Sequence, residues 1–255
     1  MSSVNQENFM KSLRLEVNEY FLENKINKKG NYKIYIKSIF MISLYFIPYF
    51  IMILGFVDNP SFFWIFWLLM GLGMAGVGMS IMHDGNHGSF SNKKYVNNIM
   101  GFSLQFLGGT NKIWKIQHNR LHHTYTNMIG HDPDVSPIPL LRFSPDAPYK
   151  KFHRFQFIYA WFLYGLMTFS FATIKEFKHL IEWKNNSIIS KKEFSELMFE
   201  LIFFKLIYYF FILFIPLAVL NIDFLQWLGL FFLMHFVAGF SLAIVFQTAH
   251  IMPNC

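Results

Sequence analysis

The chain has 255 residues, of which 54% are hydrophobic, 20% aromatic and only 15% charged. A soluble domain of this length carries about 25% charged residues, so the composition excludes an ordinary soluble protein and is typical of a membrane protein. The net charge of +7 does not indicate a nucleic-acid partner, because the lysines flank apolar runs, where cytoplasmic retention and anionic lipid account for them.

The first expected element is a short helix over residues 7–23. Four apolar residues recur there at helical spacing and predict one apolar face. They are Phe9, Leu13, Val17 and Phe21. We expect this helix to lie on the membrane surface, although the spacing fits an ordinary soluble helix equally well.

Two uncharged runs follow, Ser38–Val57 and Ser61–Met82, separated by a tight break at residues 58–60. Each is long enough to cross the hydrocarbon core of a bilayer, which takes about 20 apolar residues. The small residues between Gly71 and Ser80 include a match to the glycine-rich pattern of dinucleotide-binding sites. No strand is expected before them, so they predict close helix packing instead.

The middle of the chain contains two apolar segments that are not expected to cross the membrane. Ile99–Gly109 is too short to span, so a re-entrant or buried segment is expected. Residues 111–154 are more polar and hold half of the histidines. The uncharged run Phe155–Ile174 has basic residues on both sides, which favours an in-plane or re-entrant placement.

Two further runs, Leu197–Leu220 and Phe224–Ala249, are expected to form a second helical hairpin around the break at 221–223. Glu200 and Lys205 lie near the start of the first of these runs. They leave the residue at which it enters the membrane open, because charged side chains are costly inside a bilayer.

The distribution of Lys and Arg sets the expected topology. Basic residues are concentrated in segments 11–37, 111–120, 150–154 and 175–192. The two hairpin breaks contain none, so the basic segments are expected on the cytoplasmic side and the breaks outside. This predicts an all-α integral-membrane fold over residues 1–255, a single domain of two helical hairpins with four crossings and a cytoplasmic, histidine-rich helical cap. A five-crossing alternative would place the histidine clusters on opposite faces.

Two histidine clusters carry the functional signal. In the first, His83 and His87 are four residues apart, which puts both imidazoles on one helix face. His118 and His122 repeat that spacing, and His123 is expected to project about 100° round the same helix, toward a second ion. Five histidines in two such motifs at one membrane face predict a metal site.

Other histidines are read differently. His250 follows the last run and is expected at the same face as the clusters. His153 and His179 are interpreted as ordinary surface or core residues. His235 lies inside the last run, about 22 Å along the helix from His250. We therefore expect it to make an inter-helical hydrogen bond rather than to bind the same metal.

The residues alone leave the metal open. The chain has one cysteine, Cys255, which excludes iron–sulfur and thiolate–zinc sites at the clusters. The His-Glu-x-x-His pattern of zinc proteases is missing from the sequence. Imidazole suits zinc, copper, iron and nickel, so the ligand type does not choose among them.

Three stretches, His83–Phe90, Trp114–Asn127 and His131–Asp134, resemble the first two histidine boxes of membrane fatty-acid desaturases. The residues of these stretches are most similar to those of bacterial acyl-CoA or acyl-lipid desaturases of the linoleoyl and front-end type. The order of apolar and polar segments also agrees with that family over nearly the whole chain. The resemblance implies that six histidines bind two iron ions. They are His83, His87, His118, His122, His123 and His250.

Polar residues beside these ligands are expected to orient them, because a metal-binding imidazole usually donates its other N–H to a carboxylate or carbonyl. The candidates are Asp84, Asn119, Asp132 and Asp134. The family also carries a third box, Gln-x-x-His-His, beyond the last helix. Since this chain ends at Cys255 before any such motif, we expect a C-terminal truncation and a chain that is inactive as it stands.

The resemblance implies an O2-dependent desaturase of the bacterial inner membrane, with the histidine clusters on the cytoplasmic side. Its substrate would be a fatty-acyl chain linked to CoA, a carrier protein or a membrane lipid. Electrons would come from an external donor of the ferredoxin or cytochrome b5 type. The alternatives are a related di-iron hydroxylase or ketolase, and a non-catalytic membrane protein that binds haem or zinc.

Overall fold

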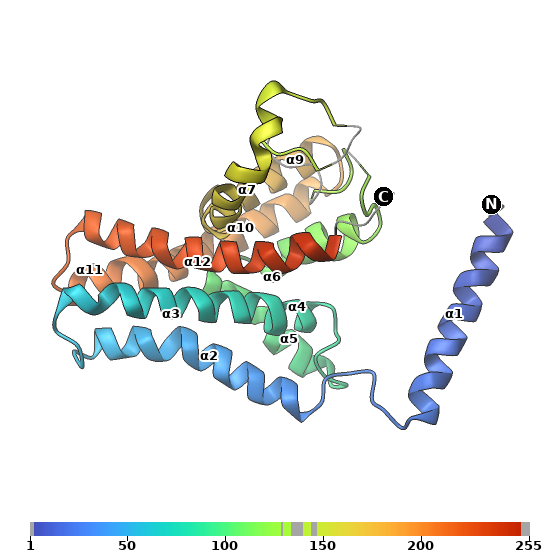
Figure 1. The fold of residues 1–255 in the computed structure, drawn as a ribbon, viewed down its shortest axis with the longest axis horizontal. Helices are drawn as coiled ribbons and strands as arrows, with labels where there is room; N and C mark the ends of the chain where they lie inside the picture. The colour runs from blue at the N-terminus through green and yellow to red at the C-terminus, as the bar shows by residue number, and fades with distance from the viewer. Residues whose placement is uncertain (1–2, 129, 134–139, 144–146, 251–255) are drawn as a thin grey trace.

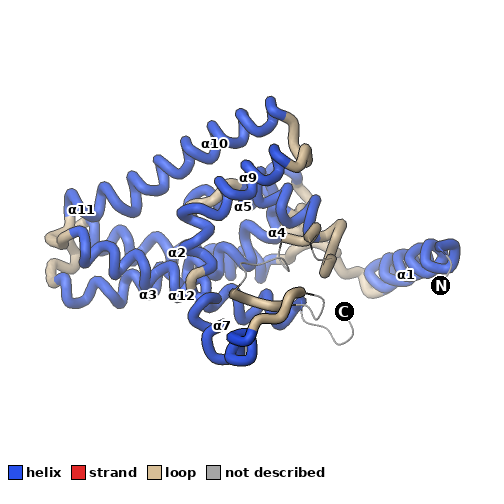
Figure 2. The backbone as a smooth tube through the Cα atoms, turned by 90° about the horizontal axis from the view of Figure 1, so that it is seen from above, coloured by secondary structure: helices blue, strands red, loops and turns tan. Residues whose placement is uncertain are grey.

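The computed structural model describes the backbone of residues 3–128, 130–133, 140–143 and 147–250, and their side chains except at 3–6 and 248–250. Every regular element in those residues is helical (Figure 2), which confirms the all-α prediction. Four helical stretches are long and apolar enough to cross a membrane. They are built on α2 (Tyr32–Ile53), α3 (Phe63–Gly76), α10 (Lys191–Tyr209) and α12 (Phe224–His250), which extend along the length of the molecule (Figure 1).

The first hairpin joins α2 to a helical rod that runs from Pro60 to Asn86. The rod consists of η1 (Pro60–Phe62), α3, the π-helical η2 (Val77–Met82) and α4 (His83–Asn86). α2 begins six residues before the predicted Ser38, because the Asn31 side chain accepts a 2.9 Å hydrogen bond from the Lys33 N–H and caps the helix there. It ends near Gly55, whose φ of 74° breaks the helical path.

The small residues of α3 bring it against two neighbours at once. A Cβ added at Gly71 would lie 2.6 Å from the backbone oxygen of Met234 in α12. One added at Gly73 would lie 2.5 Å from the backbone nitrogen of Tyr45 in α2. Neither backbone atom can move aside easily, so only glycine permits these approaches. The predicted close packing is confirmed, and α3 lies at the centre of the bundle.

The second hairpin joins α10, the π-helical η7 (Phe210–Phe214) and α11 (Ile215–Val219) to α12. Its turn lies at the same end of the molecule as the α2–α3 turn (Figures 1 and 2). α10 begins at Lys191, earlier than the predicted Leu197, because the Ser190 side chain caps its first turn. The charged residues that left its start open therefore lie within the helix.

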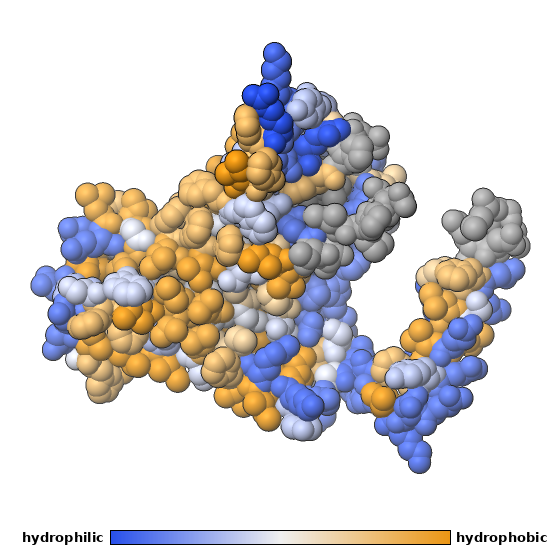
Figure 3. Space-filling view, viewed as in Figure 1, coloured by the Kyte–Doolittle hydropathy of each residue, from blue (hydrophilic) through white to orange (hydrophobic). Residues whose placement is uncertain are grey.

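The outer surface of the bundle suits lipid. Large apolar side chains such as Phe199, Leu206 and Leu225 are exposed. Hydrophobic residues cover the side that Figure 3 shows, whereas hydrophilic residues gather toward its ends. Four apolar helices with such a surface indicate a membrane protein.

The segment Ile99–Gly109, predicted to be re-entrant or buried, lies in α5 (Lys94–Phe102) and the 3-10 helix η3 (Ser103–Leu107). Gly108 ends it with a φ of 83°, a left-handed conformation that glycine adopts without strain. The chain then reverses into α6 (Asn111–Lys115) and the π-helical η4 (Ile116–His122). These short helices form one side of the cap.

The other part of the cap contains η5 (Lys151–Phe155), α7 (Gln156–Gly165), α8 (Met167–Ser170), η6 (Phe171–Lys175) and α9 (Glu176–Asn185). The stretches on either side of residue 166 are bent by 50° relative to each other, so they do not form a straight crossing. If the bent pair were one broken span, the crossings would number five. Its in-plane or re-entrant placement stays a prediction.

His235 makes the inter-helical hydrogen bonds that the sequence analysis predicts. Thr168 Oγ1 donates to the His235 backbone oxygen at 2.6 Å, so the same Oγ1 accepts from His235 Nδ1–H at 3.2 Å. Nε2 then accepts from the Tyr208 hydroxyl at 2.8 Å. The imidazole is thereby satisfied as a neutral ring joining α8, α10 and α12.

The N-terminal helix α1 (Ser3–Glu23) stands apart from the rest of the molecule (Figure 1). Phe9, Leu13 and Val17 are exposed on it. The linker that follows is tied to the cap, since Lys29 Nζ donates to the Gly88 carbonyl oxygen at 2.8 Å. The helix itself is confirmed over slightly more residues than predicted, whereas its place on the membrane surface stays a prediction.

Candidate metal centre

The first histidine pair lies at the C-terminal end of the Pro60–Asn86 rod. The His87 N–H bonds to the His83 carbonyl oxygen at 3.0 Å, one helical turn apart, and the two ring centroids are 4.5 Å apart. The two imidazoles therefore share one helix face, as predicted. On the opposite side, Gly85 rests on α5: a Cβ there would lie 2.5 Å from the backbone nitrogen of Gly101.

The second group lies on η4, which is π-helical rather than the expected α-helix. The His123 N–H bonds to the carbonyl of His118, five residues earlier, at 3.0 Å. A π turn is wider than an α turn, so two consecutive residues can lie beside the same earlier one. The His118 ring is 5.1 Å from that of His122 and 4.7 Å from that of His123.

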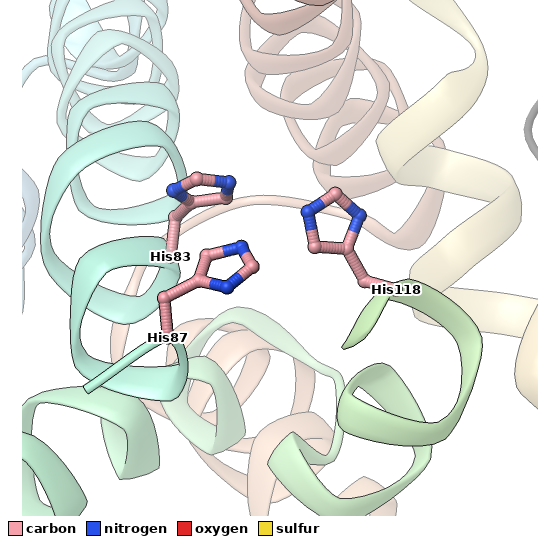
Figure 4. A group of neighbouring side chains, drawn as sticks. All are labelled: His83, His87 and His118. Carbon is pink, nitrogen blue, oxygen red and sulfur yellow. The ribbon is translucent and has the colours of Figure 1, made fainter. Parts of the chain in front are cut away.

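The two groups converge. The His118 ring centroid is 5.3 Å from that of His83 and 5.0 Å from that of His87. The candidate ligand nitrogens of these three residues lie within 4.8 Å of one another. Figure 4 shows their rings facing a common space from the two helices. His123 joins them through His87, with ring centroids 5.0 Å apart.

Burial differs among the five histidines and favours a neutral ring at His87. His118 and His122 are buried, His83 and His87 are half-buried, and His123 is exposed. Burial, followed by repulsion from the neighbouring histidines, lowers the pKa of His87 to about 4. The neutral ring is the form that binds a metal ion.

Asp132 pairs with His122 inside the cap. Asp132 is fully buried, and His122 Nδ1 lies 3.0 Å from each of its carboxylate oxygens. The Asn127 N–H also donates to Asp132 Oδ2 at 2.9 Å. A looser pair joins Asp84 Oδ1 to His83 Nδ1 at 3.3 Å. These contacts have the geometry of carboxylates that orient metal-binding imidazoles.

The remaining candidates behave differently. Asn119 Nδ2 donates to the backbone oxygen of Asn86 at 3.1 Å, so it links η4 to α4. Asp134 lies outside the described residues. His250 is the last residue of α12, and its side chain also lies outside the described part. One turn earlier, the Phe246 ring is 6.0 Å from that of His83, so the end of α12 passes beside the cluster.

Sequence reasoning missed Trp114 as a member of the site. Its indole ring lies 4.4 Å from the His118 ring, and 5.7 Å and 5.6 Å from the rings of His83 and His87. The signal was present, because Trp114 precedes His118 by four residues on the same helix. The indole places an apolar surface beside the three imidazoles.

The arrangement fits a transition-metal centre. Rings from separated parts of the chain face one another, and carboxylate partners orient two of them. An all-imidazole set of this kind suits iron, zinc, copper or nickel. The other described histidines have partners elsewhere. The ring of His179 stacks on Trp183, and the ring of His131 contacts that of Tyr125.

Comparisons with known proteins narrow the choice. The sequence model of the family described as fatty acid desaturase matches residues 59–253. An sn-1 linoleoyl-lipid 6-desaturase of Arthrospira platensis is 34% identical over 164 residues, covering 63% of this chain and 44% of that protein. An acyl-lipid (8-3)-desaturase of Physcomitrium patens is 31% identical over 261 residues, covering 97% of this chain and 52% of that protein.

A further relative, an acyl-lipid (8-3)-desaturase of Mortierella alpina, is 29% identical over 258 residues, covering 96% of this chain and 56% of that protein. The chain thus spans about half the length of the curated relatives it matches. No solved structure matches it. The match to the family model includes both histidine groups and most of the helical bundle.

Proposed function

Because this chain belongs to the fatty acid desaturase family, we propose that it takes part in the O2-dependent introduction of a double bond into a fatty-acyl chain at a histidine-bound pair of irons. The observation that carries the proposal is the convergence of the two histidine groups from α3–α4 and η4. The relatives bear out the resemblance to linoleoyl-lipid and acyl-lipid desaturases. We also propose that residues 1–255 form a single domain.

The proposed iron ligands are five histidines of the described cluster, joined by His250 from the end of α12. Those five are His83, His87, His118, His122 and His123. In support, His122 Nδ1 lies 3.0 Å from the Asp132 carboxylate, and an N–H donated there would leave Nε2 as the atom to bind a metal. Asp84 is proposed to act in the same way on His83, and Asn119 to hold the two helices together.

Iron held there would activate O2, which is the oxidant: two protons and two electrons from the acyl chain, with two protons and two electrons from the external donor, reduce O2 to two water molecules. The residues of the chain orient the imidazoles, exclude water and receive the acyl chain. Trp114 covers one side of the cluster. The apolar helices provide surroundings in which a hydrocarbon tail is stable without water.

The proposed partners follow from the same reasoning. Relatives are named for acyl-lipid substrates, so a lipid-linked acyl chain is favoured over a CoA-linked or carrier-linked one. We place the cap on the cytoplasmic side of a bacterial inner membrane, because the basic segments lie at that end and the hairpin turns contain no Lys or Arg. A separate ferredoxin or cytochrome b5-type protein would deliver electrons.

The test is product analysis on the full-length protein expressed in a host fed a defined saturated or unsaturated fatty acid. We expect products two hydrogens lighter, detected by mass spectrometry, together with iron bound to the purified protein. His118→Ala should abolish both, whereas His153→Gln, outside the cluster, should retain both. Products that gain oxygen would instead establish a hydroxylase and overturn desaturation.

A further inference from the structure

Two opposite charges are buried together where the second hairpin meets the cap. Lys205 lies within α10, inside a stretch that qualifies as a membrane span, and is 6% exposed. Glu176, the first residue of α9, is fully buried. Lys205 Nζ and Glu176 Oε2 are 3.1 Å apart. Charged residues at such depth are costly unless paired, and they are functional candidates by default.

The ammonium group binds backbone rather than side chains alone. Lys205 Nζ donates to the carbonyl oxygens of Phe171 at 2.9 Å and Ala172 at 2.7 Å, both at the start of the π-helical η6. It also donates to the carbonyl of Gly108, the residue that ends η3. One side chain of α10 thus ties together two separate parts of the chain.

The carboxylate binds the start of the second histidine helix. Glu176 Oε1 accepts from the backbone N–H and from the hydroxyl of Thr110, both at 2.8 Å. Thr110 is the residue immediately before α6, and its carbonyl accepts the Trp114 N–H at 3.0 Å. α6 continues into η4, so His118 lies about 12 Å further along the same helical path.

The turn at 108–110 also has no room to shift. A Cβ at Gly109 would lie 2.1 Å from the Phe171 ring, and one at Gly108 would lie 3.0 Å from the Tyr208 ring. Sterics press the turn against η6 and α10, and the ion pair fixes its backbone polar groups. The start of α6 is therefore held in place both by steric contacts and by the hydrogen bonds of the ion pair.

We propose that Glu176 and Lys205 are positioning residues that fix the start of α6–η4, and thereby hold His118, His122 and His123 against the first histidine pair. The part of this inference that concerns metal rests on the proposed function. The hydrogen bonds of the pair go to Thr110, Gly108, Phe171 and Ala172, not to the histidines of the centre. The pair therefore acts through Thr110 and the helix that follows.

A purely structural role predicts something different. Replacing a buried ion pair by apolar residues of similar volume is often neutral or stabilising, whereas removing one partner is strongly destabilising. A variant that removes both charges should therefore recover stability. If the pair also positions α6, that variant should still lose order at the second histidine helix, because the Thr110 N–H and the Gly108 carbonyl have lost their partners.

The experiment uses the full-length protein in lipid nanodiscs, loaded with ferrous iron. The variants are Glu176→Gln and the double variant Glu176→Leu/Lys205→Met. The control is Glu196→Gln. Glu196 is on α10, the helix of Lys205, and the change breaks only an exposed ion pair with Lys192. Three quantities are measured: thermal midpoint, iron per chain, and hydrogen exchange of peptides covering 110–123 and 77–87.

For the double variant we expect a thermal midpoint above that of Glu176→Gln, about tenfold faster exchange over 110–123 than in the parent, parent-like exchange over 77–87, and lower iron content. The control should match the parent throughout. Parent-like exchange over 110–123 in the double variant would overturn the proposal. Should Glu176→Gln fail to fold, the double variant gives the same readout without a lone buried charge.

The two proposals can fail separately. A parent protein that binds no iron would overturn the proposed function, and the exchange comparison would still decide whether the pair positions α6–η4. Conversely, normal iron binding with unchanged exchange in the double variant would overturn the positioning role and leave the proposed function standing.

Discussion

The carboxylate of Asp132 lies beside the ring of His122, with both of its oxygens 3.0 Å from Nδ1. Because a carboxylate can only accept, the neutral form of this ring has its proton on Nδ1 and its lone pair on Nε2. The tautomer of His122 is therefore set by a residue ten positions further along the chain.

Replacing Asp132 by Asn should reverse this tautomer. The Asn amide can donate to Nδ1, which would place the proton on Nε2 and remove its lone pair. We expect about a 10- to 100-fold loss of iron affinity or activity, the usual effect of losing such a partner. Iron titration of the purified protein measures it. Asp58→Asn, in the turn between the first two spanning helices, should leave affinity unchanged, and equal affinity in both variants would contradict the assignment.

Gly85→Ala tests the contact beneath the first histidine pair. The added Cβ would lie 2.5 Å from Gly101 N and 2.8 Å from Asn97 O, so α4 must move away from α5. We expect a destabilisation of about 1–3 kcal/mol together with reduced iron content. Gly229→Ala is the control, since no atom lies within 4 Å of its added Cβ. It should be neutral or stabilise by about 0.5–1 kcal/mol. An unchanged thermal midpoint in Gly85→Ala would contradict this prediction, because α4 and α5 would then separate without a cost in stability.

Tyr208→Phe removes the donor to His235 Nε2 and leaves that nitrogen unpaired inside the bundle. We expect a loss of about 1–2 kcal/mol in the free energy of unfolding, the upper part of the range for hydrogen bonds between membrane helices. Unfolding in mixed micelles measures it. Tyr209→Phe should cost less, because its hydroxyl is part-buried and 3.3 Å from the Ala172 oxygen. A larger cost at Tyr209 would refute this ranking.

Removing the metal should loosen the cap more than the bundle. With iron at about 100 times its dissociation constant, chelation is expected to lower stability by about 2.7 kcal/mol. Hydrogen exchange should rise over residues 83–87 and 118–123, and stay constant over 227–235 within α12. A uniform rise across all three segments would contradict a metal confined to the two histidine groups.

The orientation can be tested with single cysteines in a Cys255→Ser background. A membrane-impermeant thiol reagent applied to intact cells should label Asp58→Cys and Asn221→Cys, which lie in the hairpin turns. Lys93→Cys, just before α5, should react only after the membrane is opened. The reverse pattern would place the cap outside and refute the positive-inside argument.

Much of this architecture can be predicted from the sequence because its signals are local. Run length identifies the spans, and a spacing of four residues puts His83 and His87 on one face whatever surrounds them. Helix ends were less accurate, since caps such as Asn31 and Ser190 extended α2 and α10 beyond the apolar residues that define a run.

The rest depends on contacts between distant segments. The π turn that gathers His122 and His123 beside His118 arises from a shift in backbone hydrogen bonding that leaves no mark in residue spacing. In the sequence, Lys205 left open the residue at which its helix enters the membrane. Its partner Glu176 is 29 residues away, and only the fold shows that the two charges meet.

The uninterrupted rod from Pro60 to Asn86 has a consequence for the substrate. At 1.5 Å per residue, His83 lies about 35 Å from the start of the rod, whereas the hydrocarbon layer of a bilayer is about 30 Å thick. If the rod crosses upright and the proposed function holds, the metal centre is at the level of the lipid headgroups, and a methylene from the middle of an acyl tail must leave the hydrocarbon layer to reach it. The height to which the protein lifts the tail would then decide which carbons are oxidised.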